Sequence, residues 1–442
     1  MYRLTARLIV YRDIRNDGIL KSLSEIIKDF DKGLADEFPG REAMVSRIYE
    51  QIHKLLDLAT VYGFDDNLWH NYLTFLLITT EVPFSVVCEK AGDRGGSVVS
   101  FAKSDLKIMK ELFDYDFTRI ENELGIDCFS VIENYQSVKK SSNAYNANVS
   151  TCVRRISKEL ENAADENEMY DILTCFYKDF GVGKFGLNKA FRVKDNNGSA
   201  MIRPITNIAD VRFDDIIGYE SQKKELIENT RAFVEGRHAN NCLLYGDAGT
   251  GKSTSIKAVL NEFYPEGLRM IEIYKHQFAC LADTISQIKS RNYRFIIYMD
   301  DLSFEDFEIE YKYLKAVIEG GLEIRPENVL IYATSNRRHL IKESFNDRND
   351  MGEGSNDVHH SDTLQEKLSL VARFGLKINY SAPGESEYLN IVKEVAAKYK
   401  DKIKLSEEEL LKEAKKWEIF AGGRSGRTAR QFIDSILSNG GR

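Results

Sequence analysis

The sequence has no run of about 18 apolar residues, the length that a helix needs to cross a bilayer. We therefore expect no membrane span. Its first residues, MYRLTARLIVYRDIRNDG, also lack the uninterrupted apolar core of a secretion signal, because Arg3, Arg7 and Arg12 break the pattern. Together these two absences predict a protein of the cytoplasm.

Cysteines at metal-ligand spacing are missing as well. The six cysteines form no C-x-x-C pair and have no histidines nearby at zinc-ligand spacing. They are Cys88, Cys128, Cys152, Cys175, Cys242 and Cys280. We expect them to be reduced thiols, mostly buried.

An excess of basic residues is also absent. The chain carries 61 Lys and Arg against 69 Asp and Glu, which gives a formal net charge of -8. This balance argues against a chain built as a whole to coat nucleic acid or anionic lipid, although it leaves room for a local basic patch. Nucleic acid is therefore a partner that the composition does not favour.

The length of 442 residues predicts about three domains, because a single core stops growing as the chain lengthens. Hydrophobic residues at 43% and charged residues at 29% are typical of folded globular chains. No internal repeat of fixed period is present. We place the domain limits at 1–200, 201–382 and 383–442.

The first of these segments predicts an all-helical N-terminal domain. Apolar residues recur there at spacings of three and four, which lines one face of a helix. They include Met44, Ile48, Ile52, Leu55, Ala59, Leu106, Met109, Phe113, Phe117, Ile120 and Leu124. The polar stretch KDNNGS, residues 194–199, can bury no core face and is interpreted as the boundary.

The second segment predicts an α/β domain. Short apolar runs such as NCLLYG, RFIIYMD and NVLIYATSN alternate with helical patterns, which indicates a parallel sheet covered by helices on both faces. After Pro383 the strands stop. Three helical patterns follow, the second starting with a capping box of Ser406 and Glu409, and they predict a small helical lid.

The stretch LLYGDAGTGKST contains the pattern G-x-x-x-x-G-K-[S/T] between a strand and a helix, which is the context that a phosphate-binding P-loop requires. Its glycines let backbone N–H groups turn toward phosphate oxygens, Lys252 adds a cation, and Ser253 offers a hydroxyl to Mg²⁺. The alternative is a chance match in a glycine-bearing turn. The candidate nucleotide-binding residues are Gly246, Asp247, Ala248, Gly249, Thr250, Gly251, Lys252, Ser253 and Thr254.

A second glycine pattern, GVGKFG at residues 181–186, matches the dinucleotide fingerprint G-x-G-x-x-G letter for letter. It follows MYDILTCFYKDF, whose apolar residues keep helical spacing, whereas the fingerprint must follow a strand. We therefore interpret it as a turn.

Polar residues at the ends of two further strands are candidates for metal binding and catalysis. Asp300 and Asp301 end one apolar strand, where Asp300 and Ser253 together can hold Mg²⁺. Asn336 ends another and is placed to orient a water beside the terminal phosphate. The alternatives are solvated acids on a loop and an ordinary turn asparagine.

Arginines near the end of the sheet and in the lid complete the candidate set. Arg373 precedes a strand, and an arginine there can reach the γ-phosphate of a neighbouring subunit, although a surface salt bridge is the commoner role. The start of the last helix carries Arg424, Arg427 and Arg430, for which a solvated face is the alternative.

Taken in order, these motifs resemble the AAA+ superfamily of P-loop ATPases over about residues 210–438, and the whole chain resembles a bacterial AAA+ family known only as a domain of unknown function. The resemblance implies ATP and Mg²⁺ as cofactors and Asp301, Asn336 and Arg373 as catalytic residues. It also implies base contacts from Ile217, Gly218 and Tyr219 and a lid sensor at Arg430 or Arg427.

Two features depart from the AAA+ pattern. The second Walker B acid is usually glutamate, and Asp301 is shorter by about 1.5 Å, which can slow hydrolysis or pass the role of general base to Glu305. A polar segment at residues 344–363 contains His359 and His360, and we interpret it as a flexible loop rather than a metal site.

The leading hypothesis is an ATPase that assembles head to tail into a ring or open arc and remodels an unknown protein client. A nucleotide-controlled binding switch with little hydrolysis is the alternative. A DNA loader or initiator remains open because this fold hosts many functions. A small-molecule P-loop kinase is least favoured, since no acceptor site follows Asn336.

Overall fold

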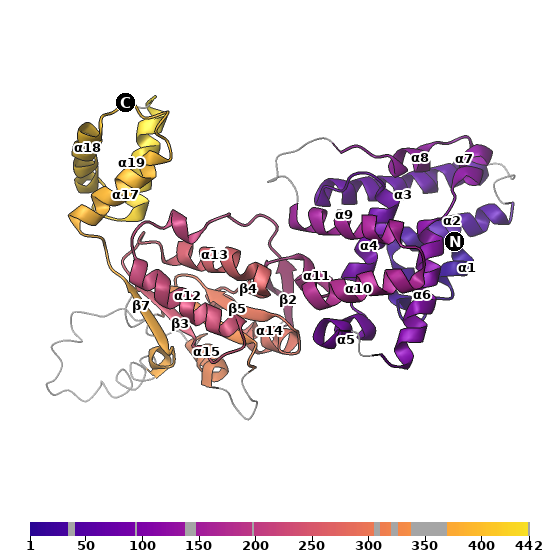
Figure 1. Cartoon of the computed structure of the whole chain (residues 1–442), viewed down its shortest axis with the longest axis horizontal. Helices are drawn as coiled ribbons and strands as arrows, with labels where there is room; N and C mark the ends of the chain where they lie inside the picture. The colour runs from indigo at the N-terminus through magenta and orange to yellow at the C-terminus, as the bar shows by residue number, and fades with distance from the viewer. Residues whose placement is uncertain are drawn as a thin grey trace. The chain divides into compact units, whose positions relative to one another are not determined.

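A computed structural model describes residues 1–33, 40–92, 95–137, 147–196, 199–304, 310–319, 326–336 and 369–440. The chain divides into two compact units. The first unit comprises Met1–Lys189 with Pro204–Asn207, and the second comprises Ala190–Arg203 with Ile208–Arg442. Each unit is described by itself (Figure 1).

The first unit is built of helices packed around one apolar core, as the spacing of its apolar residues predicts. Met44, Ile48 and Leu55 are buried on one face of α3, and Leu106 and Met109 are buried on α6. The helices are α1 (Tyr2–Thr5), η1 (Arg12–Asn16), α2 (Gly18–Asp31), α3 (Gly40–Tyr62), α4 (Leu68–Thr79), α5 (Pro83–Ala91), α6 (Ser97–Phe113), α7 (Thr118–Leu124), α8 (Cys128–Glu133), α9 (Ala147–Asn162), α10 (Glu166–Phe180) and α11 (Gly183–Leu187). The glycine pattern at 181–186 follows helix α10 and forms the start of α11, so it does not follow a strand.

A buried carboxylate fastens the N-terminal segment of this unit to α6. The side chain of Asp105 is fully buried, and its oxygens accept hydrogen bonds from the backbone N–H groups of Ile9, Val10 and Tyr11 at 2.7–3.0 Å. Three donors converge on one acidic group, so the charge is compensated inside the protein.

Replacing Asp105 by alanine is expected to lower the free energy of unfolding of this unit by about 3 kcal/mol, because three backbone donors lose a charged acceptor. Urea unfolding followed by circular dichroism measures the effect. Asp114→Ala is the control, since Asp114 is an exposed residue that pairs with Lys110. An equal, small loss in both variants would contradict the assigned role.

The second unit contains a seven-stranded sheet in the order β2-β1-β4-β5-β6-β3-β7. The pairs from β1 through to β7 are parallel, and every residue of β6 is buried, as expected for a sheet with both faces covered. The strands are β1 (Ala190–Asn196), β2 (Ser199–Pro204), β3 (Cys242–Gly246), β4 (Leu268–Glu272), β5 (Arg294–Met299), β6 (Val329–Ser335) and β7 (Leu376–Tyr380).

Helices are interleaved with these strands along the chain (Figure 1). They are η2 (Phe213–Asp215), α12 (Glu220–Val234), α13 (Lys252–Phe263), η3 (Tyr264–Glu266), η4 (Lys275–Cys280), α14 (Leu281–Ile288) and α15 (Glu310–Glu319). The predicted α/β fold with a parallel P-loop sheet is confirmed.

The stretch KDNNGS falls in the pair of strands β1 and β2 at the edge of this sheet. The compact unit begins at Ala190 because β1 pairs in parallel with β4. Polar residues are tolerated at the end of β1 because residues 194–196 are exposed and lie beyond the three residues of β1 that pair with β4. The division that we place at residue 200 lies within this pair of strands.

The last three helices form the predicted helical lid, which has a small core of its own. These helices are α17 (Glu385–Ala397), α18 (Glu407–Phe420) and α19 (Gly426–Ser438). Ser406 and Glu409 form the predicted capping box, in which the Glu409 carboxylate accepts the backbone N–H of Ser406 at 3.0 Å. The core is made by Tyr388, Val392, Leu410, Ala414, Phe432 and Ile433, among others.

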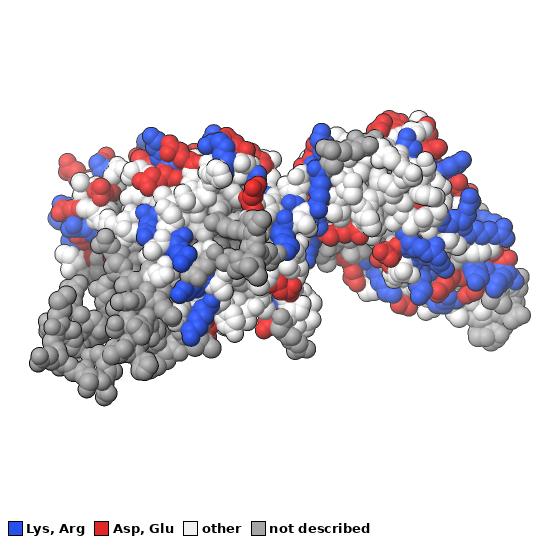
Figure 2. Space-filling model, turned by 90° about the horizontal axis from the view of Figure 1, so that it is seen from below, with Lys and Arg blue, Asp and Glu red and all other residues white. Residues whose placement is uncertain are grey.

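No single helix in the described part of the chain is long and apolar enough to cross a membrane, although α4 and α5 pass that test together as a pair bent by 73°. Most of the large apolar side chains of α4 are buried in the core of the first unit. The face shown in Figure 2 carries both basic and acidic side chains.

Candidate functional site

The loop between β3 and α13 has the backbone conformation that a phosphate cradle needs. Gly246, Gly249 and Gly251 have φ values of 129°, 78° and 100°, which L side chains rarely adopt. A Cβ at Gly246 would lie 2.3 Å from the carbonyl oxygen of Tyr380, so the loop also needs glycine there for space. Helix α13 begins directly after this loop, with its N-terminal N–H groups at the site.

The side chain of Lys252 is hydrogen-bonded to the P-loop backbone. Its Nζ donates hydrogen bonds to the carbonyl oxygens of Gly246 and Asp247, at 2.8 and 2.6 Å. Burial lowers the pKa of Lys252, while the nearby carboxylates of Asp247, Asp301 and Asp300 act to raise it. A nucleotide phosphate would supply the strong negative partner that this buried ammonium group has only in part.

Ser253 and Asp300 lie together, as the sequence predicts for a magnesium site. The Ser253 hydroxyl donates to Asp300 Oδ1 at 2.8 Å, and Thr334 of β6 donates to the same oxygen at 2.6 Å. Partial burial acts to raise the pKa of Asp300, but hydrogen bonds, among them those from Thr334 and Ser253, outweigh it and hold the pKa below its usual value. Asp300 is therefore a carboxylate at neutral pH.

This pair fits Mg²⁺ by its chemistry. Mg²⁺ takes hard oxygen ligands and is usually bound through one or two carboxylates together with substrate phosphates. Among the described residues, no group of three or more His, Cys, Asp and Glu side chains could hold a metal by itself. The site therefore fits a metal that is shared with a nucleotide.

Asp301 and Asn336 contact each other across the ends of β5 and β6. Asn336 Nδ2 donates to Asp301 Oδ1 at 2.8 Å, and Asp301 has a φ of 49°, in the left-handed region that aspartate tolerates better than most residues. The two predicted catalytic groups are thus paired with each other. Glu305, the other candidate base, and His359 and His360 lie outside the described residues.

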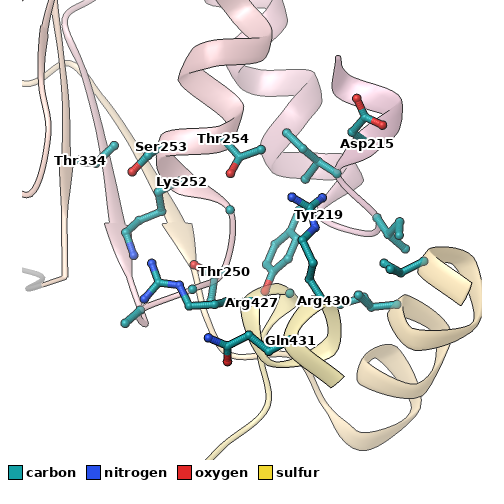
Figure 3. A pocket seen from close by; sticks show the side chains of 18 of the residues that line it. Asp215, Tyr219, Thr250, Lys252, Ser253, Thr254, Thr334, Arg427, Arg430 and Gln431 are labelled. Carbon is teal, nitrogen blue, oxygen red and sulfur yellow. The ribbon is translucent and has the colours of Figure 1, made fainter. Parts of the chain in front are cut away.

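A cavity of about 530 Å³ opens over these groups, a volume within the usual range of small-ligand sites. It is bordered by the P-loop and Walker B residues on one side and by lid helices on the other (Figure 3). Of the predicted residues, those that line it are Ile217, Tyr219, Ala248, Gly249, Thr250, Gly251, Lys252, Ser253, Thr254, Asp300, Asp301, Asn336, Arg427 and Arg430. Gly218, Gly246, Asp247 and Arg373 are not among its lining residues.

The lid meets the P-loop directly. The backbone N–H of Arg427 donates to the carbonyl oxygen of Gly249 at 3.2 Å, and a Cβ at Gly249 would lie 2.8 Å from Ser425 Oγ. In Figure 3, Arg427, Arg430 and Gln431 of α19 lie on the lid side of the cavity. The third arginine of this segment, Arg424, instead binds the carboxylate of Glu418.

Tyr219 contacts the end of β7 and the segment that leads from it into the lid. Its ring stacks on Tyr380 with centroids 5.2 Å apart, and its hydroxyl donates to the carbonyl oxygen of Ser381 at 2.9 Å. The Asp247 carboxylate accepts the N–H of Ala382 at 2.7 Å. Gly218 borders a second cavity of about 560 Å³, which adjoins the first at Ile217 and Tyr219.

Arg373 precedes the N-terminal end of β7, whereas its own P-loop lies at the C-terminal end of the neighbouring strand β3. Strand β7 runs parallel to β3, with Leu376 opposite Cys242 and Tyr380 opposite Gly246. Arg373 precedes β7, whereas the P-loop follows β3, so the length of a five-residue strand, about 16 Å, separates the two levels. The exposed side chain of Arg373 is therefore badly placed to serve the site of its own subunit.

The structure adds lining residues that the motifs do not reveal. They are Asp215, Ile216, Thr334, Ile391, Val395, Gly426, Gln431 and Asp434. Thr334 stands two residues before Asn336 on a strand already singled out, so alternation along β6 could have pointed to it. The lid residues Ile391 and Val395 follow helical spacing, which by itself indicates only a core face.

A family model described as "Protein of unknown function (DUF815)" matches residues 187–440, more than half of the chain. The chain belongs to the DUF815 family. The matched residues cover the sheet and the lid and therefore the whole candidate site. The parallel sheet and the P-loop of this DUF815 chain resemble those of AAA+ P-loop proteins, the family that its motifs predict. No curated protein matches it in sequence.

Two solved structures resemble about half of the DUF815 chain. The Thermotoga maritima RuvB Holliday junction branch migration motor is 14% identical, with a TM-score of 0.31, over 51% of this chain and 72% of that one. C. elegans PCH-2 is 18% identical, with a TM-score of 0.35, over 51% of this chain and 64% of that one. The function proposed for the DUF815 chain rests on its own site.

Proposed function

We propose that this DUF815 chain binds ATP with Mg²⁺ in the cavity between the sheet and the lid and hydrolyses it. The observation that carries the proposal is the Ser253–Asp300 hydrogen bond beside the buried Lys252, at the start of a helix and facing the lid arginines. A cation, helix N–H groups and a carboxylate–hydroxyl pair converge on one cavity, which is what a metal-bound polyphosphate requires.

Each side chain has a defined task in this proposal. The P-loop N–H groups and Lys252 bind the phosphates, Ser253 and Asp300 hold Mg²⁺, and the bound metal neutralises charge that develops on the phosphates. Asp301 accepts the proton of the attacking water, which Asn336 orients. Because Asn336 donates to Asp301, that hydrogen bond must loosen before both side chains can face the water.

The lid is the element that transmits the nucleotide state. It contacts the P-loop through the Arg427–Gly249 hydrogen bond, and Lys398, directly after α17, pairs with Asp215 beside the cavity at 2.6 Å. Loss of the γ-phosphate changes what Arg427 and Arg430 can bind, so the lid is expected to shift on hydrolysis. We propose that this movement remodels a protein client, with the helical N-terminal unit receiving the movement or holding the client.

The position of Arg373 supports the proposal that the chain assembles into a ring or an open arc. An arginine at the opposite end of the strands from its own P-loop can complete the site of the next subunit in a head-to-tail interface. Repeated head-to-tail interfaces close into a ring or leave an open arc. ATP turnover per subunit is therefore expected to rise with protein concentration through the micromolar range. Turnover per subunit that stays constant over that range, at a measurable rate, would contradict sites completed between subunits.

A nucleotide-controlled binding switch is the second candidate, favoured by the pairing of Asp301 with Asn336. It predicts that ATP binds while turnover stays near zero at every concentration. Retention of a partner should then require ATP and survive Asp301→Asn. Equal retention with and without ATP would exclude the switch.

A further inference from the structure

Thr334 binds three consecutive residues of the Walker B turn. Its hydroxyl donates to Asp300 Oδ1 at 2.6 Å and accepts the backbone N–H of Asp301 at 3.0 Å. Its carbonyl oxygen accepts the N–H of Leu302 at 2.7 Å. Thr334 is 2% exposed and stands at the end of β6, so it is itself fixed by the sheet.

The hydroxyl of Thr334 uses its single proton on Asp300. That choice is forced by chemistry, because the backbone N–H of Asp301 is a donor and must meet a lone pair. One oxygen atom, the hydroxyl of Thr334, therefore fixes the position of the Asp300 carboxylate relative to the Asp301 peptide group. Among the described residues, no other side chain bonds to both the Asp300 carboxylate and the Asp301 N–H group.

The turn that Thr334 holds is not a relaxed one. Asp301 has a φ of 49°, a conformation that costs a non-glycine residue free energy unless its surroundings maintain it. Thr334 accepts hydrogen bonds from the N–H groups of Asp301 and Leu302, which lie on either side of the φ and ψ angles of Asp301. The same residue thus supports the backbone that aims Asp301 and the carboxylate that faces Ser253.

We propose that Thr334 is a positioning residue that locks the magnesium ligand and the catalytic base into one geometry. This inference rests on the proposed function, since it assigns Asp300 to Mg²⁺ and Asp301 to the water. If Ser253 turns its oxygen to the metal, Thr334 continues to hold Asp300. Partners that orient a metal ligand in this way typically change metal affinity or activity by about 10–100-fold when they are removed.

Thr334→Val tests the proposal because it removes the hydroxyl and keeps the shape. ADP affinity is measured by fluorescence or calorimetry in EDTA and then over a Mg²⁺ titration. In the variant, the affinity in EDTA should stay within about twofold of the original chain, while the Mg²⁺ concentration at half effect should rise about 10–100-fold. The value of kcat should fall by a similar factor with little change in KM.

Two further variants separate positioning from general damage. Thr334→Ser retains the hydroxyl and should restore the Mg²⁺ dependence to within about threefold. Thr230→Val is the matched control, because Thr230 is a fully buried threonine whose hydroxyl bonds to Leu226 and Tyr332 away from the cavity. It should leave the Mg²⁺ dependence unchanged. If Thr334→Val does not fold, Thr334→Ala is measured in its place.

Several results would overturn the inference. An unchanged Mg²⁺ dependence and kcat in Thr334→Val would show that the hydroxyl positions nothing. Equal weakening of ADP binding with and without Mg²⁺, or failure of Thr334→Ser to rescue, would show a merely structural role. If the original chain binds no nucleotide at all, the proposed function itself fails, which is a different outcome.

Discussion

Replacing Lys252 by alanine is expected to weaken ATP binding by about 100-fold, because the variant loses a charge-assisted hydrogen bond to the phosphates worth about 3 kcal/mol. The lysine is buried, and its ammonium group donates to two loop carbonyl oxygens and lies in the field of nearby carboxylates. Binding of a fluorescent ATP analogue at constant Mg²⁺ measures the change.

The matched control for this variant is Lys257→Ala. Lys257 lies on the same helix α13, and it is exposed and does not line the cavity. It should bind ATP as the original chain does. If the two variants bind equally well, the phosphates do not lie in the loop at 246–253 and the proposed site is wrong.

Replacing Arg373 by alanine is expected to lower kcat by about 10³-fold or more, the usual contribution of an arginine that stabilises charge on the transferred phosphoryl group. ATP affinity should change by less than about threefold, because Arg373 does not line the cavity of its own subunit. Steady-state turnover and direct binding measurements separate these two quantities. Lys377→Ala on β7 is the control, since Lys377 is an exposed cation on the strand that follows.

Mixing variants tests whether Arg373 acts between subunits. In a mixture, an Arg373→Ala subunit still carries an intact P-loop, and a Lys252→Ala subunit still carries Arg373. Adjacent copies can therefore rebuild a complete site, and the mixture should hydrolyse ATP faster than either variant alone. No recovery, together with unchanged kcat in Arg373→Ala, would remove Arg373 from the mechanism.

The local chemistry of the site could be predicted from the sequence because it depends on residues that are close in the chain. The P-loop needs glycine where φ is positive, and those glycines stand a few residues from Lys252 and Ser253. Apolar runs ending in Asp300 or Asn336 predict strands with polar residues at one edge of a parallel sheet. Ser253 and Asp300 therefore meet as predicted, although 47 positions separate them.

The roles of other residues depended on contacts that no spacing encodes. Tyr219, a predicted base contact, lines the cavity, and its hydroxyl also donates to Ser381, far along the chain. The place of β1 in the sheet likewise depends on its pairing with β4, so the polar stretch at 194–199 gave no sign of it. Both outcomes follow from strand order, which brings distant segments together.

The sequence by itself determined the fold class, the phosphate-binding loop and the acids at the strand ends, since these follow from short-range backbone and burial rules. Only the tertiary structure decided that Thr334 bonds to both Asp300 and Asp301 and that the start of α19 contacts Gly249. It also decided that Arg373 lies at the opposite end of the strands from the P-loop. The reason is physical: a hydrogen bond needs two groups within about 3 Å, and for distant segments only packing fixes that distance.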